Sequence, residues 1–166
     1  WIESDPREFM VWFSSKCDES GQLRRIVRYL KVWSDFRKGE LPAGMIMSIL
    51  AAENFISSPR DDIALCLTLA RIMENLERSF TCLRPTTPAG EDLLAIFSKT
   101  KRDYFLSSLK SLVRAASFAT SDSASHKDAC KQWQLCSGAD RFPFEDEEIV
   151  EERFRVDLKY SIDIDC

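Results

Sequence analysis

The chain has 166 residues, of which 45% are hydrophobic and 11% aromatic, and its formal net charge at pH 7 is −4. This length and composition predict one folded domain with a hydrophobic core and exclude an intrinsically disordered chain. The acidic balance excludes a broad basic surface for duplex nucleic acid, so any site for an anion must be local.

The first predicted helix is short and begins near Pro6. Asp5 is a favourable N-cap residue, and a proline suits the first helical position because the backbone N–H that it lacks has no partner there. One face of this helix is aromatic, with Phe9, Trp12 and Phe13. We therefore expect the helix to pack on the core, and a polar link at residues 16–21 to follow it.

The second predicted helix begins at Gln22 and has two different faces. Its apolar residues keep the spacing of one helical face: Leu23, Ile26, Val27, Leu30 and Trp33. Basic residues recur on the other face, with Arg25 beside them: Arg24, Arg28 and Lys31. The apolar face can dock into a helical bundle, and the basic face can bind phosphates. The basic face of an amphipathic helix is more often simply solvated, so the spacing alone leaves both interpretations open.

An almost wholly apolar helix is predicted next, at residues 42–55. Gly39 and Pro42 mark the break ahead of it, and residues 45–52 include almost no polar side chain. A helix that is apolar all round lies in the interior of a domain. We therefore expect an all-α fold, a bundle of about six or seven helices around this central helix.

A long helix is predicted at residues 61–80. We expect five of its residues to face inward: Ile63, Leu67, Ala70, Leu76 and Phe80. Asp61 and Asp62 fall in its first turn, where the helix dipole favours negative charge. We favour this capping role over metal binding, because adjacent helical residues point about 100° apart and no third carboxylate follows at helical spacing.

Three further helices are predicted after a proline-rich loop, at about residues 91–98, 101–120 and 125–135. The long one has five apolar residues on one face: Phe105, Leu109, Leu112, Val113 and Ala116. The last one directs three residues toward the core: Ala129, Trp133 and Cys136. Gly138 follows it as a natural C-cap.

The C-terminal part of the chain changes character. Residues 144–152 are mostly acidic, which predicts a linker after a helical lobe at residues 1–143. In residues 153–166 apolar and polar side chains alternate, as is typical of a half-buried β-strand. A lone strand is not stable by itself. We therefore expect either a partner strand or the start of a truncated C-terminal domain.

Several ordered blocks of the sequence carry a family resemblance. The second helix contains VRYLKVW, and the apolar helix follows as LPAGMIMSILAAENF. Further along the chain come SSPRDDIALCLTLARIMENL, RPTTPAGEDLL and DACKQWQLCSGADRFP. Together these blocks resemble the helical lobe of the cGAS/DncV-like nucleotidyltransferases. The resemblance implies a Mg²⁺-dependent enzyme that joins nucleoside triphosphates into cyclic di- or trinucleotide signals in bacterial anti-phage defence.

The resemblance also implies which residues bind the nucleotide. In the family, the lysine that corresponds to Lys31 reaches the phosphates of a bound nucleoside triphosphate, and Arg24 and Arg28 would add positive charge on the same face. Related enzymes often have a serine at the position of Ala43, and that side-chain contact is missing here. The small residues Ala43 and Gly44 and the main chain at the start of the apolar helix remain for binding.

The catalytic residues that the family implies are absent from this chain. The family holds two Mg²⁺ ions with carboxylates that follow a Gly-Ser turn. Asp163 and Asp165 are spaced D-x-D, but they come after the helical lobe and no Gly-Ser turn precedes them. We interpret them as alternating surface charge. The resemblance therefore places the catalytic residues and Mg²⁺ in a missing N-terminal catalytic lobe, and we expect the chain alone to be inactive.

The six cysteines predict reduced, partly buried thiols in a cytoplasmic protein, because they are scattered and several fall within apolar helical patterns. His126 and Cys130 are spaced i, i+4 and could begin a zinc site with Cys136, for which Cys82 is the only plausible fourth ligand. We favour a surface histidine beside core thiols. No apolar run is long enough for a membrane span, and no signal-peptide pattern is present, so we expect no contact with a membrane.

A second class of function stays open. The chain could be a stand-alone, non-catalytic helical module whose terminal strand pairs with a protein partner. The two hypotheses separate at Lys31. Replacing this lysine by glutamate should weaken triphosphate binding only if the helical lobe binds nucleotides.

Overall fold

The computed structural model describes residues 5–37, 41–42 and 44–137. This part of the chain forms α1 (Pro6–Lys16), α2 (Gln22–Phe36), α3 (Gly44–Asn54), α4 (Asp61–Arg78), α5 (Lys99–Ala119) and α6 (His126–Ser137). The only strand-like pairing among the described residues is an isolated bridge between Leu83 and Asp92. The all-α prediction is therefore confirmed for this part. The predicted linker at 144–152 and the predicted strand at 153–166 lie outside the described residues.

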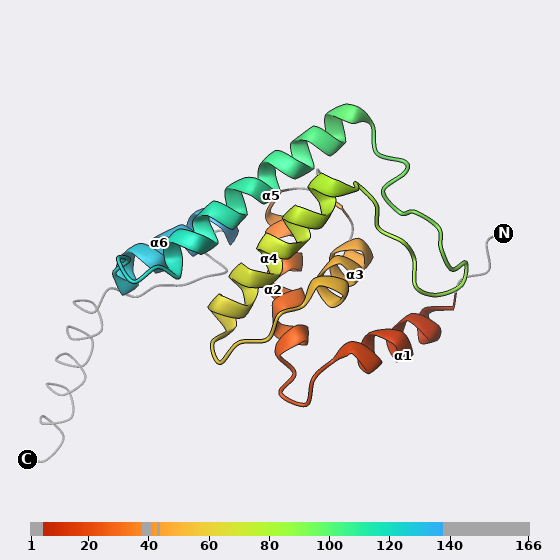
Figure 1. The fold of residues 1–166 in the computed structure, drawn as a ribbon, viewed down its shortest axis with the longest axis horizontal. Helices are drawn as coiled ribbons and strands as arrows, with labels where there is room; N and C mark the ends of the chain where they lie inside the picture. The colour runs from red at the N-terminus through yellow and green to blue at the C-terminus, as the bar shows by residue number, and fades with distance from the viewer. Residues whose placement is uncertain (1–4, 38–40, 43, 138–166) are drawn as a thin grey trace, which may run out of the picture.

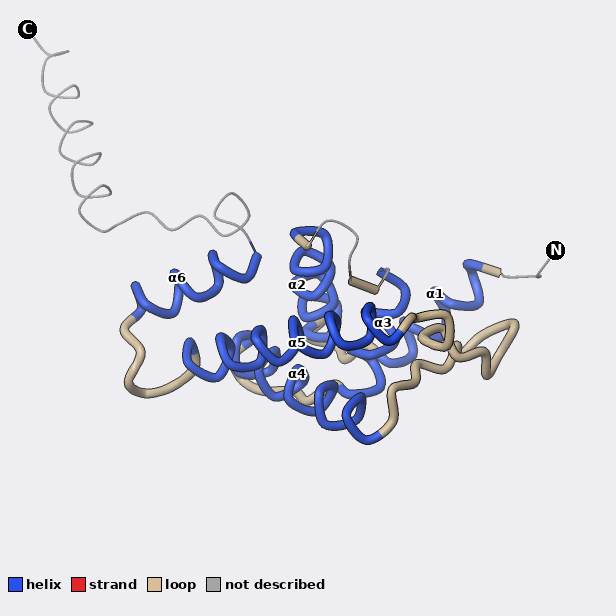
Figure 2. The backbone as a smooth tube through the Cα atoms, turned by 90° about the horizontal axis from the view of Figure 1, so that it is seen from above, coloured by secondary structure: helices blue, strands red, loops and turns tan. Residues whose placement is uncertain are grey.

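Four helices form the body of the bundle, and α1 and α6 lie at its opposite ends (Figure 1). Helix α4 contacts α2, α3 and α5, while α6 packs against α5 and α2, and α1 packs against α3. Figure 2 shows α4 and α5 side by side from above, with α6 at one end. Within the described residues, none of the helices combines the length and the apolar character that crossing a membrane requires.

The hydrophobic core runs between α2, α3, α4 and α5. Its two largest fully buried side chains are Trp33 of α2 and Phe105 of α5. Helix α3 is buried over most of its length, as its composition predicts, with Met45 as an exposed exception. It shares the interior with α2 and α4. Its position as the single centre of the bundle therefore stays a prediction.

The start of α1 follows the expected chemistry. The Asp5 carboxylate accepts a hydrogen bond from the backbone N–H of Arg7 at 2.8 Å, and Pro6 occupies the first turn. Phe9, Trp12 and Phe13 pack half-buried against the core. The helix is tied on at both of its ends, because Lys16 forms an ion pair with Glu53 of α3 and Glu8 accepts a hydrogen bond from the loop after α4.

Helix α2 also has the two faces that the sequence predicts. All five of the predicted apolar residues are buried: Leu23, Ile26, Val27, Leu30 and Trp33. The three basic residues of the opposite face are exposed: Arg24, Arg28 and Lys31. Tertiary burial of one stripe is what stabilises such a helix in a protein.

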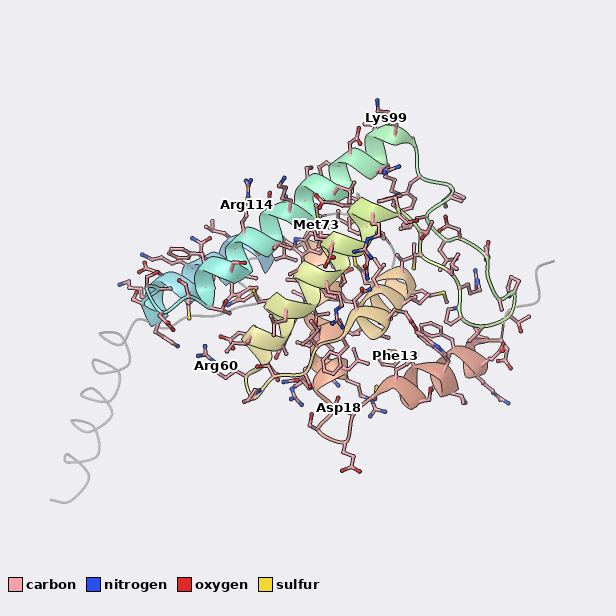
Figure 3. All side chains as sticks on the ribbon, in the orientation of Figure 1. Phe13, Asp18, Arg60, Met73, Lys99 and Arg114 are labelled. Carbon is pink, nitrogen blue, oxygen red and sulfur yellow. The ribbon has the colours of Figure 1, made fainter. Side chains whose placement is uncertain are left out.

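The predicted inward face of α4 is wrong in part. Leu67 and Ala70 are exposed, and Phe80 lies beyond the end of the helix. The buried face is made by Ala64, Leu65, Thr68, Leu69, Ile72, Met73 and Leu76. Met73 lies where α4 faces α5 (Figure 3). Of the five predicted residues, Leu76 is buried and Ile63 is half-buried.

The predicted short helix at residues 91–98 does not form. Asp92 pairs instead with Leu83 in the isolated bridge, and its carboxylate accepts hydrogen bonds from the backbone N–H groups of Cys82 and Leu94, at 2.9 and 3.0 Å. These bonds satisfy the backbone of the loop without a helix. The regular structure resumes at α5, where the Ser98 hydroxyl caps the backbone N–H of Lys101.

Helices α5 and α6 agree with the predictions. Phe105, Leu109, Leu112 and Ala116 are buried on one face of α5, and Val113 at its edge is half-buried. In α6, Trp133 and Cys136 are buried and Ala129 packs against the core. The proposed C-cap, Gly138, lies outside the described residues.

Candidate functional site

The exposed face of α2 carries three cationic side chains that are in no ion pair found among the described residues. Arg24, Arg28 and Lys31 form no ion pair or hydrogen bond through their side chains with any other described residue. Arginine and lysine side chains without partners keep their full capacity to bind an anion. This face is therefore the part of α2 whose chemistry suits an anion.

The structure brings two of the predicted site residues into contact, from two different helices. Gly44 is the first residue of α3, and a Cβ atom placed on it would lie 3.3 Å from Cε of Lys31 and 3.7 Å from its Cδ. The aliphatic stem of Lys31 thus rests on the glycine. This contact brings the end of the Lys31 side chain close to the N-terminus of α3, where backbone N–H groups have no intrahelical partner.

A hydrogen bond joins α2 to the segment that leads into α3, close to the contact between Lys31 and Gly44. The Ser34 hydroxyl donates to the backbone carbonyl of Pro42 at 3.0 Å, and both residues are buried. The bond joins the last turn of α2 to the segment just before α3. Ala43, the remaining member of the predicted site, lies outside the described residues.

Arg25 differs from the three free cations because it is committed to an ion pair. Its Nε donates to Asp61 Oδ2 at 2.6 Å and its Nη2 donates to Asp61 Oδ1 at 3.0 Å. Gln22 and the Tyr29 hydroxyl also donate to this carboxylate, at 3.0 and 3.4 Å. The hydrogen bonds from Arg25 and Gln22 lower the pKa of Asp61 to about 2, against the desolvation that would raise it.

The paired aspartates of α4 therefore bind arginines. Asp62 is held by Arg60, whose Nη2 lies 2.5 Å from Asp62 Oδ2, at the start of α4 (Figure 3). Both carboxylates lie in the first turn, as expected, but no side chain caps the helix at Arg60. Within the described residues, no three histidine, cysteine or acidic side chains are grouped closely enough to hold a metal ion.

The histidine and cysteines considered for zinc are spread over the fold. Cys130 Sγ lies 4.0 Å from His126 Nε2 on α6, whereas Cys82 is buried in the loop after α4. Burial raises the pKa of Cys82 to about 12 and also raises the pKa of Cys136. Such thiols stay protonated and unreactive at neutral pH. The five cysteines of the described part form no disulfide with one another.

A pocket that sequence reasoning missed opens on the other flank of α2. It has a volume of about 410 Å³ and lies between α2, α4, α5 and α6. Its lining comprises Arg28, Tyr29, Leu30, Val32, Trp33, Asp61, Asp62, Leu65, Leu112 and Trp133. Arg28 thus borders this pocket, while Lys31 rests on α3. The one available signal was the aromatic pair Tyr29 and Trp33 beside a basic residue.

No model of a known protein family matches the sequence. The arrangement of the described residues is therefore the basis on which a function can be argued. That arrangement offers an exposed cationic face on α2, a lysine laid against the start of α3, and an aromatic pocket beside them.

Proposed function

We propose that this chain is the nucleotide-binding helical lobe of a Mg²⁺-dependent nucleotidyltransferase that makes cyclic di- or trinucleotide messengers from nucleoside triphosphates in bacterial anti-phage defence. The contact between Lys31 and Gly44 carries the proposal. It places the one lysine that the family resemblance singles out against the start of α3, with its charge unpaired among the described residues.

The contact suits a triphosphate for a physical reason. A polyphosphate is a concentrated negative charge that needs both point charges and N–H donors. Lys31 supplies the charge, and the N-terminus of α3 supplies a favourable dipole. Arg24 and Arg28, on the same exposed face of α2, raise the local positive potential although the whole chain is acidic.

The lobe would bind and orient the nucleotide, and other parts of the enzyme would perform the chemistry. Phosphoryl transfer of this kind needs carboxylates that hold Mg²⁺. In the proposal those carboxylates belong to a catalytic lobe that closes over the exposed face of α2. The present chain is then expected to make no cyclic nucleotide alone, and detection of such a product with the pure chain would contradict the proposal.

The sharpest test is Lys31→Glu in the natural gene product. Reversing the charge beside the phosphates should weaken MgATP affinity by about tenfold or more, since one charge-assisted contact is lost and a repulsive one appears. The affinity is measured by isothermal titration calorimetry. Lys31→Arg, which keeps the positive charge, should retain most of the affinity.

A matched control is Lys110→Glu, which makes the same charge reversal at an exposed position of α5. It should leave MgATP affinity within about twofold of the parent, because it acts only through long-range and screened electrostatics. Equal affinities for the parent and Lys31→Glu would overturn the proposal. The stand-alone helical interaction module would then be the better description.

A further inference from the structure

The pocket beside α2 has a mostly apolar lining that is rich in aromatic side chains. Three aromatic side chains contribute to its wall, namely Tyr29, Trp33 and Trp133, together with aliphatic side chains of α2, α4 and α5. Its volume of about 410 Å³ falls in the range of small-molecule sites. Aromatic side chains favour stacked or edge-on contact with another ring.

The charge at the pocket is positive once the existing pairs are counted. Of the two carboxylates in the lining, Asp61 is neutralised by Arg25 and Asp62 by Arg60. The guanidinium of Arg28 has no partner among the described residues. The rim therefore has one uncompensated charge, and that charge is a cation.

A buried donor in the wall is also unsatisfied. Trp33 is 1% exposed, and its indole N–H has no hydrogen-bond partner within the described part of the chain. That nitrogen has almost no exposed surface, so it is not counted as a donor for a ligand. The pocket thus combines an aromatic wall with an unpaired cation.

We propose that this pocket binds a planar aromatic carboxylate or similar aromatic anion, with its ring among Tyr29, Trp33 and Trp133 and its acidic group on Arg28. The site is separate from the contact between Lys31 and Gly44. Arg28 belongs both to this pocket and to the cationic face of α2, so an aromatic anion here and a triphosphate on that face would compete for its charge.

The test uses 2-naphthoate as the probe and isothermal titration calorimetry with the complete 166-residue chain. The parent should bind 2-naphthoate more tightly than the neutral 2-naphthamide, and Arg28→Ala should weaken naphthoate binding about fivefold to tenfold. Arg24→Ala is the matched control, since Arg24 lies one turn away on the same exposed face and does not line the pocket. It should change the affinity by less than about twofold.

A second variant tests the cavity itself. Val32→Trp places a bulky ring at a half-buried position of the lining and should abolish naphthoate binding, while Lys31→Ala, which introduces no negative charge beside Arg28, should change it by less than about twofold. The two variants distinguish the pocket from the proposed triphosphate site, where loss of the Lys31 charge should weaken binding and Val32→Trp should not. No naphthoate binding by the parent, or equal losses in Arg28→Ala and Arg24→Ala, would overturn the inference.

Discussion

Gln22 shows how one side chain can organise a junction between distant segments. Its amide donates to the backbone carbonyl of Ser58 at 2.8 Å and accepts from the backbone N–H of the same residue at 3.1 Å. The same amide donates to Asp61. The start of α2, the loop before α4 and the first turn of α4 are thus joined through a residue that is 5% exposed. A buried amide whose groups are satisfied specifies such a junction.

The ion pair at this junction predicts a pH-dependent stability. The pKa of Asp61 is lowered from 3.8 to about 2, mainly by Arg25, so its ionised form stabilises the fold above about pH 4. This contribution is lost as the pH falls toward 2. Asp61→Asn should therefore lower the free energy of unfolding by about 1 to 2 kcal/mol at pH 7, since the partly exposed pair is screened by solvent.

The difference in free energy of unfolding between Asp61→Asn and the parent should shrink as the pH is lowered from 4 to 2. Urea unfolding at several pH values can measure this difference. Asp62→Asn is the control, because it removes a neighbouring carboxylate whose partner Arg60 is well exposed. Asp62→Asn should lower the free energy of unfolding by less than Asp61→Asn does at pH 7. A difference that is independent of pH would contradict the assigned role of Asp61.

The sequence predicted the residues on the exposed face of α2 but not all of their surroundings. Helical spacing was enough to place Arg24, Arg28 and Lys31 together, because the apolar stripe opposite them is unambiguous. The spacing of residues along the helix could not show that the side chain of Lys31 packs against α3 while Arg28 borders a pocket. Those neighbours depend on how helices pack, and packing is not encoded in the period of one helix.

At the scale of the helix, α4 shows where periodicity fails. Apolar residues occur on more than one side of it, so the stripe that faces the core cannot be chosen from spacing alone. Leu67 was expected inside and is 41% exposed, whereas Leu69 is fully buried. Packing against α2, α3 and α5 determines which side of α4 faces the core.

A pair of substitutions tests this orientation of α4. Leu69→Ala should lower the free energy of unfolding by about 2 to 5 kcal/mol, because it leaves a cavity at a fully buried position of the core. Leu67→Ala makes the same chemical change on the exposed side and should cost less than about 1 kcal/mol. Chemical denaturation of the two variants measures both values. Similar losses of unfolding free energy in Leu69→Ala and Leu67→Ala would mean that α4 is rotated relative to the described structure.

The segment at 91–98 illustrates a second limit at the same scale. Its composition is compatible with a short helix, and the structure forms a bridge and turns instead. Short helices have little stability of their own. The competing bonds that Asp92 makes to Cys82 and Leu94 therefore decide the outcome, and one of these partners lies in a different part of the loop.

For the whole molecule, the cysteines provide a measure of global opening. Cys82 is 3% exposed, and burial raises its pKa to about 12, so at pH 8 its thiol is both shielded and protonated. Alkylation with iodoacetamide should reach Cys82 only when the fold opens. The half-buried Cys17, Cys66 and Cys130 should react sooner.

Peptide mass mapping during a time course at pH 8 separates these sites. The rate at Cys82 should rise in Leu69→Ala, because that variant populates the unfolded state more. The rates at the half-buried thiols should change less. Rapid modification of Cys82 in the parent protein would contradict its burial.

The overall architecture was largely predictable from the pattern of apolar residues. Amphipathic stripes of the right length gave five of the helices within a few residues of their described ends. They could not give the crossing of α4 over α2 or the placement of α6 beside α5. Those features arise from side-chain shape and buried volume, which a single sequence does not display.

The lysine that rests on Gly44 has a thermodynamic consequence for any ligand it binds. A lysine side chain normally gives up rotamer entropy worth about 2 kcal/mol when it is fixed. Part of that freedom is already gone here, because the stem lies within 3.3 to 3.8 Å of the position that a Cβ atom would take on Gly44. This side-chain entropy is lost on folding, so less of it remains to be lost when a ligand binds. If Lys31 binds a ligand, its contact with Gly44 would therefore strengthen that binding although the glycine itself need not touch the ligand.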